Sequence, residues 1–185
     1  MNGSQRVDPL SHITSTALAA SVFVRQERDK WPMIGTAVVA GVAPDLDGLS
    51  LLWGFSAYVR YHQSLTHNLF VVPVLILLVA YLFYRFSPYH NFPALLGLSA
   101  LGGFGHLLLD LTITWGLAPF WPLSPKTYCL NLVLLTDPVF LLVCGTACYL
   151  IFRHTWWSYR RLLALIIFPS LALYLLARYF FLLPR

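Results

Sequence analysis

The sequence predicts an all-α membrane protein, a polytopic bundle of about six helices in a single domain over residues 1–185. Of its 185 residues, 58% are hydrophobic and only 10% are charged, whereas about 25% are charged in an ordinary soluble domain. The mean hydropathy is +0.70. Apolar stretches close to the roughly 20 residues that a helix needs to span a bilayer recur along the chain.

The first fifty residues predict two helices that are short or interrupted. The stretch 11–24, "SHITSTALAASVFV", is apolar but short, and its Ser/Thr-rich start suits a helix cap. A second helix is expected over 33–43 and should end at "APDLDG", because the residue before a proline is biased out of the helical region. The two helices form either a short re-entrant hairpin or two shallow spans.

Four further stretches have the apolar character of membrane helices: 68–84, 93–112, 132–152 and 162–183. The second of them carries a Gly102-Gly103-x-Gly105 cluster, which permits close helix contact. The last two belong to residues 125–185, which add two membrane helices to the part of the chain that carries the polar motifs.

The distribution of Lys and Arg predicts an orientation. If six helices alternate, one side of the membrane receives most of the basic residues: Arg25, Arg28, Lys30, Arg85, Arg153, Arg160 and Arg161. Cytoplasmic loops carry an excess of such residues, so this side is expected to be cytoplasmic. The net charge is +5, but its basic residues are scattered between apolar runs, and we expect no nucleic-acid partner.

The same alternation brings His and Asp residues from separate stretches to the outer ends of the helices: His12, Asp45, Asp47, His62, His67, His106 and Asp110. An aspartate at the centre of a membrane helix costs roughly 2.5–3.5 kcal/mol on insertion scales, so something must compensate it. His106 and Asp110 are four residues apart and share a helix face. Imidazole nitrogens and carboxylate oxygens suit Zn²⁺ and other first-row divalent ions, which predicts a metal site here.

A structural role is the alternative for each of these side chains. His106 and Asp110 could simply hydrogen-bond to each other or to a neighbouring helix. The sequence "PDLDG" also makes a good turn, in which Asp side chains bond to the backbone. His12 and His67 could serve at helix starts or in loops.

Two further residues are candidates for hydrogen bonding to the metal ligands. His62 either supports the site or lies in a loop. Asp137 precedes Pro138 and either supports the site or marks a helix kink with a hydrogen-bonded acid. The three cysteines lack CxxC spacing and predict neither a disulfide framework nor a zinc knuckle.

Four segments resemble the YdjM-like family of membrane-bound metal-dependent hydrolases: "DPLSHITSTALAA", "GVAPDLDGLS", "HQSLTHNLF" and "GHLLLDLTITWGLAPFWPLS". They occur in the family's order and cover residues 8–124. The family pairs an N-terminal histidine with a P-D-x-D turn, an H-R-G-x-T-H element and an H-x-x-x-D motif. Here Gln63 and Ser64 stand where the family has Arg and Gly, and Asn68 replaces a Ser.

The family is in turn similar to the all-helical superfamily of zinc-dependent phospholipase C and single-strand nucleases. This resemblance implies four metal ligands for one or two divalent ions, most plausibly zinc: His12, His67, His106 and Asp110, with Asp110 as a candidate bridge. It also implies that Asp45, which Asp47 accompanies, orients or deprotonates the attacking water.

The expected function is therefore metal-dependent hydrolysis in the cytoplasmic (inner) membrane, with the site at the extracytoplasmic face. The expected substrate is a phosphoester of a lipid or lipid-linked molecule, so membrane lipids are the expected partners. The alternative is a membrane protein whose metal ion is structural or transported, without hydrolytic turnover. Transport is disfavoured because the polar residues stop at one level of the bundle.

Overall fold

A computed structural model describes residues 9–61, 65–112, 116–132 and 137–181. Within these residues the regular elements are helices, which confirms the all-α prediction, and an isolated bridge joins Leu117 to Tyr128. The α-helices are α1 (Pro9–Ser21), α2 (Lys30–Val42), α3 (Phe55–Tyr61), α4 (Val71–Phe86), α5 (Phe92–Thr112), α6 (Pro138–Phe152) and α7 (Arg160–Phe181). Three 3₁₀ helices accompany them: η1 (Glu27–Asp29), η2 (Ala43–Trp53) and η3 (His154–Tyr159).

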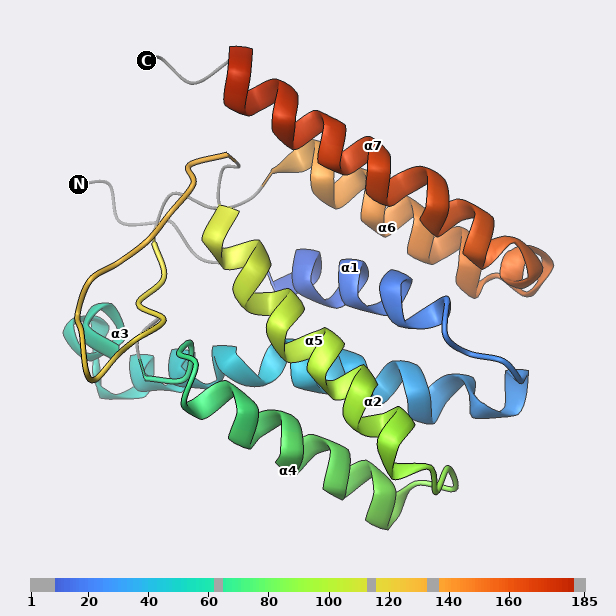
Figure 1. Cartoon of the computed structure of the whole chain (residues 1–185), viewed down its shortest axis with the longest axis horizontal. Helices are drawn as coiled ribbons and strands as arrows, with labels where there is room; N and C mark the ends of the chain where they lie inside the picture. Colours follow the sequence, from blue (N-terminus) through green and yellow to red (C-terminus); the bar gives the residue numbers. More distant parts are fainter. Residues whose placement is uncertain (1–8, 62–64, 113–115, 133–136, 182–185) are drawn as a thin grey trace.

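The long helices run alternately in opposite directions, as Figure 1 shows. Helix α5 lies against α1, α2 and α4, and α6 lies against α1 and α7. The connections 22–29, 87–91 and 153–159 therefore share one end of the bundle, which we call the basic end (Figure 1, right). The starts of α1, α4 and α6 and the ends of η2 and α5 lie toward the opposite end.

The second helix does not stop at "APDLDG" as the sequence predicted. Its α-helical part ends at Val42, but the chain continues without interruption as η2 to Trp53. Pro44 stands in the first turn of η2, where its missing N–H costs no hydrogen bond. Gly54 then turns the chain with φ 103°, a conformation that favours glycine, and leads into α3, which the sequence analysis missed.

Three helical stretches of the described chain are long and apolar enough to cross a membrane: Glu27–Trp53, Phe92–Thr112 and Trp157–Phe180. Helices α4 and α6 are apolar but shorter. As described, α1 has 13 residues, fewer than the roughly 20 that a span requires. The second of the two doubtful helices thus reaches spanning length through η2, whereas residues before Pro9 lie outside the described part of the chain.

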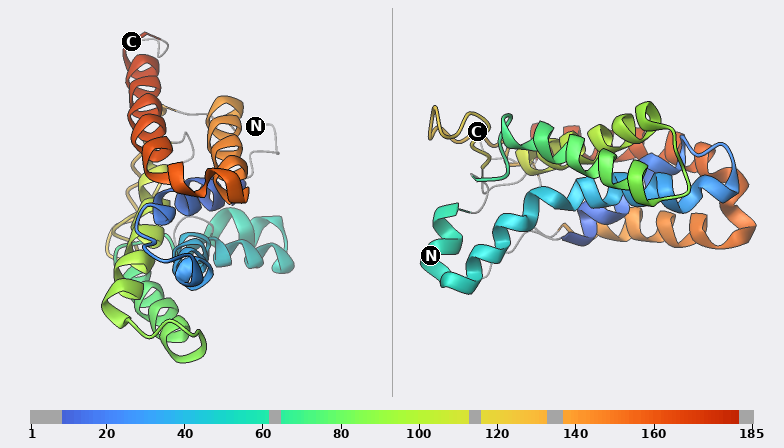
Figure 2. Two further views of the ribbon diagram at one scale, coloured as in Figure 1. Left: turned by 90° about the vertical axis from the view of Figure 1, so that its right-hand side faces the viewer. Right: turned by 90° about the horizontal axis from the view of Figure 1, so that it is seen from below.

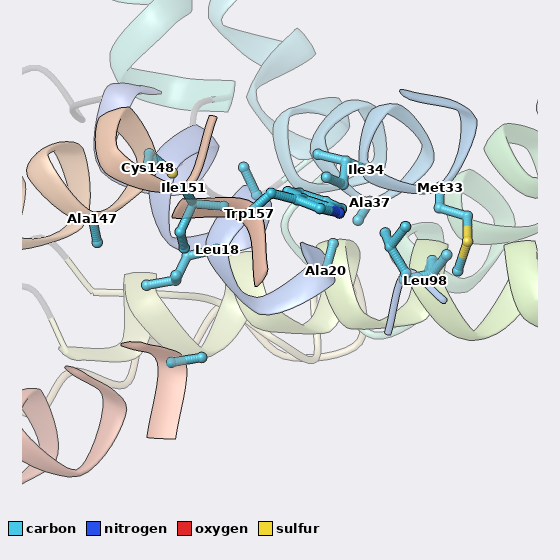
Figure 3. Close-up of a cluster of buried hydrophobic side chains, with 13 residues drawn as sticks. Leu18, Ala20, Met33, Ile34, Ala37, Leu98, Ala147, Cys148, Ile151 and Trp157 are labelled. Carbon is cyan, nitrogen blue, oxygen red and sulfur yellow. The ribbon is translucent and has the colours of Figure 1, made fainter. Parts of the chain in front are cut away.

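The main hydrophobic core lies between α1, α2, α5, α6 and η3 and includes Leu18, Ala37, Leu98, Ile151 and Trp157 (Figure 3). Small residues allow these helices to come close together. A methyl group on Gly102 of α5 would lie 2.1 Å from the carbonyl oxygen of Ala37 and 2.8 Å from the amide nitrogen of Gly41, both in α2. Only glycine fits this contact, so the expected role of the glycine cluster is confirmed at Gly102.

Two cationic side chains, the partly buried Arg160 and the buried Lys30, hold the basic end together. The guanidinium of Arg160 donates to the carbonyl oxygens of Ser21 (3.0 Å), Val24 (2.6 Å) and Trp157 (2.9 Å). It thereby satisfies carbonyl groups that the end of α1 leaves without helical partners. The Lys30 amino group is buried against the rings of Trp157, Phe152 and Trp31, at 4.3–5.1 Å from their centroids.

Candidate metal centre

Six of the predicted site residues meet at the end of the bundle opposite the basic end. They come from four parts of the chain: α1 supplies His12, η2 supplies Asp45 and Asp47, the segment before α4 supplies His67, and α5 supplies His106 and Asp110. Together these six residues form what we call the His/Asp cluster.

Asp110 is at the centre of the cluster. Its Oδ1 atom lies 3.3 Å from Nε2 of His12. Its Oδ2 atom lies 3.2 Å from Nε2 of His106 and 3.4 Å from Nε2 of His67. One carboxylate thus faces histidines from three separate segments, and its two oxygens point to different sides of the cluster.

Asp45 completes a set of four donor atoms. Its Oδ1 atom lies 3.5 Å from Nε2 of His67 and 3.7 Å from Nε2 of His106. Two ligands of a tetrahedral zinc ion, each bound at about 2.1 Å, lie about 3.4 Å apart. Each of the observed nitrogen–oxygen pairs, at 3.2–3.7 Å, is therefore spaced as two ligands of one ion would be.

The remaining nitrogens of two imidazoles are held from behind. Nδ1 of His106 donates to the carbonyl oxygen of Gly41 at 2.6 Å. Nδ1 of His67 donates to Oδ2 of Asp47 at 2.8 Å. Histidines that bind metals usually donate their second N–H in this way, which fixes the ring and makes the other nitrogen a better ligand.

Asp47 therefore has a different place from the catalytic one predicted for it. It is buried and lies behind His67, on the side of the ring away from Asp110. The structure thus makes Asp47 a positioning residue that orients His67. The sequence could suggest that Asp45 and Asp47 lie near each other, but it could not show which of them faces the centre.

His12 joins the cluster from the other side. Its ring stacks on that of His106, with the centroids 3.9 Å apart and the planes 20° apart. The groups His12–His106–Asp110 and Asp45–His67–His106 each bring three possible donor atoms within 4.8 Å of one another. The donors accordingly divide into two neighbouring groups that share His106.

The buried polar atoms of the cluster are poorly satisfied by the described protein. Nδ1 of His12, Nε2 of His106 and both carboxylate oxygens of Asp45 and Asp110 are buried without a hydrogen-bond partner there. Native proteins contain only a few such atoms, and an ion or an ordered water often accounts for them. The donors thus fit a divalent cation better than they fit one another.

Charge in the cluster also favours a cation. Burial lowers the pKa of His67, but the nearby carboxylates of Asp45, Asp47 and Asp110 outweigh it and raise the pKa to about 10. The carboxylates around this imidazole therefore stabilise positive charge strongly. A divalent ion would supply positive charge at the same place.

Asp137 is not brought into the His/Asp cluster. Its Oδ1 atom accepts from the amides of Val139 and Phe140 and caps α6, while Oδ2 accepts from the Tyr174 hydroxyl (2.9 Å) and pairs with Arg178 (3.1 Å). The carboxylate starts a helix and ties α6 to α7, which explains its burial without a metal. His62, the other predicted supporting residue, lies outside the described residues.

Several contacts that build the site were not found from the sequence. The Thr66 hydroxyl donates to the carbonyl oxygen of Pro44 and joins the His67 segment to η2. Asn68 accepts from the amides of Phe70 and Val71 at the start of α4. Asparagine and serine are both good helix-capping residues, so replacement of the family's serine by Asn68 leaves that task intact.

No curated protein and no solved structure matches the chain. The sequence model of one family, described as YdjM inner membrane protein, matches residues 7–183. Because this match covers nearly the whole length, the chain belongs to the YdjM inner membrane protein family.

Proposed function

We propose that this protein is a membrane-bound metal-dependent hydrolase. The observation that carries the proposal is the convergence of Nε2 of His67 and His106 with oxygens of Asp45 and Asp110, at separations of 3.2–3.7 Å. Nitrogen and oxygen donors at this spacing suit zinc, and they also accept other first-row divalent ions.

His67, His106 and Asp110 would hold the first ion. His12 and the second oxygen of Asp110 offer a position for another, with Asp110 as the bridge. A bound ion of this kind lowers the pKa of water toward neutrality and offsets negative charge that develops at phosphorus. Its presence would also balance the buried carboxylates.

Asp45 is the residue we assign to the attacking water. Its side chain is 15% exposed, whereas those of His67, His106 and Asp110 are at most 1% exposed. Both of its carboxylate oxygens are themselves buried, so the proton that this carboxylate would accept comes from a water molecule enclosed in the cluster. His67 and Asp110, which are enclosed, remain fixed as ligands.

The membrane setting favours a lipid or lipid-linked phosphoester as the substrate. The cluster lies at one end of an apolar bundle from an inner membrane protein family. The opposite end carries the basic connections, and cytoplasmic loops are rich in Lys and Arg. We therefore place the site at the extracytoplasmic face of a multi-pass protein, where headgroups of membrane lipids lie.

A structural metal ion is the competing function, and one observation favours it. The two histidine nitrogens and the Asp45 and Asp110 oxygens could close completely around one ion. Structural zinc sites have four protein ligands, whereas catalytic sites keep one position open. The two functions therefore differ in the role of Asp45. It binds the metal ion in a structural site, and it accepts a proton from the attacking water in a catalytic one.

The test uses the full-length protein, loaded with zinc or manganese and reconstituted in phospholipid vesicles. Release of phosphorylated headgroups is measured by mass spectrometry for the wild type, Asp45→Asn and His90→Ala. His90 is exposed at the basic end and bonds to the Tyr84 carbonyl, so its variant is the matched control.

We expect Asp45→Asn to retain its metal and to lose at least about a hundredfold in rate, which is the usual contribution of a general base. His90→Ala should match the wild type. Loss of metal from Asp45→Asn, together with no product from the metal-loaded wild type on any lipid phosphoester, would establish the structural alternative instead.

A further inference from the structure

Helix η2 presents three different faces because a 3₁₀ helix has three residues per turn. Pro44, Asp47 and Ser50 form the buried face. Leu46, Leu49 and Leu52 form an exposed face, and Leu52 is 80% exposed. We call these three leucines, together with the neighbouring Trp53 and Phe55, the leucine stripe.

Asp45 lies between these two faces. It is the partly exposed member of the His/Asp cluster, and it precedes Leu46 in the chain. Its carboxylate oxygens are buried, but the exposed part of its side chain brings the cluster to the surface beside the leucine stripe. A molecule that approaches Asp45 from this side must pass over apolar side chains.

The chain that follows Asp47 along the stripe carries no charged residue over eleven positions. Residues 48–58, "GLSLLWGFSAY", contain no acidic or basic residue. Figure 2 shows η2 and α3 running out beside the bundle rather than folding back over it. Trp53 is 79% exposed at the end of η2, and tryptophan is enriched where membrane helices meet the bilayer interface.

The stripe also continues a surface that faces the membrane. It belongs to the apolar stretch Glu27–Trp53, which is long enough to cross a bilayer. At 1.5 Å per α-helical residue and 2.0 Å per 3₁₀ residue, Asp45 lies about 24 Å, Leu49 about 32 Å and Leu52 about 38 Å along the axis from Lys30, so the stripe crosses the outer boundary of a hydrocarbon core of about 30 Å. The cluster thus lies at the depth of acyl chains near one interface.

We propose that the leucine stripe lies in the outer leaflet of the bilayer and receives the acyl chain of a lipid whose headgroup reaches Asp45. Entry to the cluster is then lateral, from the leaflet, and amphiphilic phosphoesters are preferred over water-soluble ones. The membrane location of the stripe does not depend on the proposed function. The role of the bound lipid as a substrate does.

The location is tested with nitroxide labels on the full chain in phosphatidylcholine vesicles. Cysteines replace Leu49 or Leu52 in a Cys129→Ser background, which removes the exposed native cysteine. Leu165→Cys, at an exposed leucine of α7, is the lipid reference, and Lys126→Cys, in an exposed loop, is the water reference. Electron paramagnetic resonance compares relaxation by oxygen with relaxation by a water-soluble nickel complex.

We expect the label at Leu49 to be relaxed more strongly by oxygen than by nickel, as the Leu165 label is, and the label at Leu52, nearer the interface, to lie between the lipid and water references. Strong relaxation of both labels by nickel would place the stripe in water. Protection from both agents would mean that protein covers it, as in a contact with a second copy of the chain. Either result would overturn the proposal, and neither depends on metal or hydrolysis.

The role of the acyl chain is tested with the double substitution Leu49→Asn, Leu52→Asn. We expect at least a tenfold fall in kcat/KM for vesicle lipid, with unchanged metal content and unchanged turnover of a tail-free phosphoester of the same headgroup. An equal loss on both substrates would contradict the role of the stripe. If the wild type hydrolyses neither substrate, the proposed function fails, and with it the substrate role, while the label measurements still decide the location.

Discussion

The imidazole of His106 donates from Nδ1 to the carbonyl oxygen of Gly41 over 2.6 Å, joining α5 to α2 at the edge of the His/Asp cluster. A carbonyl oxygen can only accept, so this bond fixes the proton on Nδ1. In the neutral ring, Nε2 then carries a lone pair, and it lies 3.2 Å from Asp110. The packing of two apolar helices thereby selects the tautomer of the neutral ring that a metal ligand needs.

The close approach of α2 and α5 at Gly102 should be necessary for this arrangement. A methyl group there would meet backbone atoms of Ala37 and Gly41, which cannot move without separating the helices. We expect Gly102→Ala to destabilise the protein by about 1–3 kcal/mol, as overpacking usually does, and to weaken metal binding. Thermal unfolding in detergent and metal titration measure the two effects.

Gly97→Ala is the matched control on α5, because a methyl group at Gly97 would have no neighbour within 4 Å. It should be neutral or stabilise the helix by up to about 1 kcal/mol. If both alanine variants unfold at the wild-type temperature, the close contact at Gly102 does not constrain the fold.

Asp47 should act on the metal through His67. The substitution Asp47→Asn keeps an oxygen that can accept from Nδ1 but removes the charge behind the ring. We expect metal affinity to fall about 10- to 100-fold, the usual cost of changing such a partner, with an unchanged number of ions at saturation. Competition with a chelator measures the affinity. A loss of stoichiometry as large as that of Asp110→Asn would instead make Asp47 a direct ligand.

Asp137 should matter for stability and not for the metal. The substitution Asp137→Ala removes the cap of α6 and leaves Arg178 without its carboxylate. Loss of a cap costs about 0.5–2 kcal/mol, so the unfolding temperature should fall while the metal content stays at the wild-type level. If the Asp137→Ala protein folds but loses its metal, Asp137 contributes to metal binding after all.

The proposed orientation predicts which surfaces can be reached from outside the cell membrane. In the Cys129→Ser background, a cysteine at Lys126 should react with a membrane-impermeant maleimide on intact cells. A cysteine at Arg28, whose side chain is 80% exposed at the basic end, should react only after permeabilisation. The reverse pattern would invert the topology and place the cluster at the cytoplasmic face.

The sequence predicted α5 and α7 well because each is a long apolar run, whereas the predicted stretch 132–152 forms α6 only from Pro138 onward. The predicted stretch 93–112 corresponds closely to α5 (Phe92–Thr112), and 162–183 to α7 (Arg160–Phe181). The sequence predicted the end of the α-helix before Pro44, but it missed the 3₁₀ helix that begins at Ala43 and carries Pro44 in its first turn. Local sequence patterns do not predict this continuation, because η2 depends on contacts with α3 and the His67 segment.

The sequence identified the residues of the candidate site more completely than it predicted the helices of the first fifty residues. Charged groups are so rare in this chain that His and Asp at the ends of apolar stretches were conspicuous, and alternation of the helices placed them together. What alternation could not supply was orientation: that Asp47 faces the back of His67, and that Asp137 serves a helix cap. Those roles depend on side-chain direction, which emerges only from packing.

The most direct test of the metal centre is the metal content of the full-length protein purified in detergent, measured by elemental mass spectrometry. The wild type and His90→Ala should each hold one or two equivalents of zinc or another first-row divalent ion, and the double variant His106→Ala, Asp110→Ala should lose them. Equal absence of metal from all three proteins, even after incubation with zinc and manganese, would contradict the account and leave the His/Asp cluster as a buried hydrogen-bonded network.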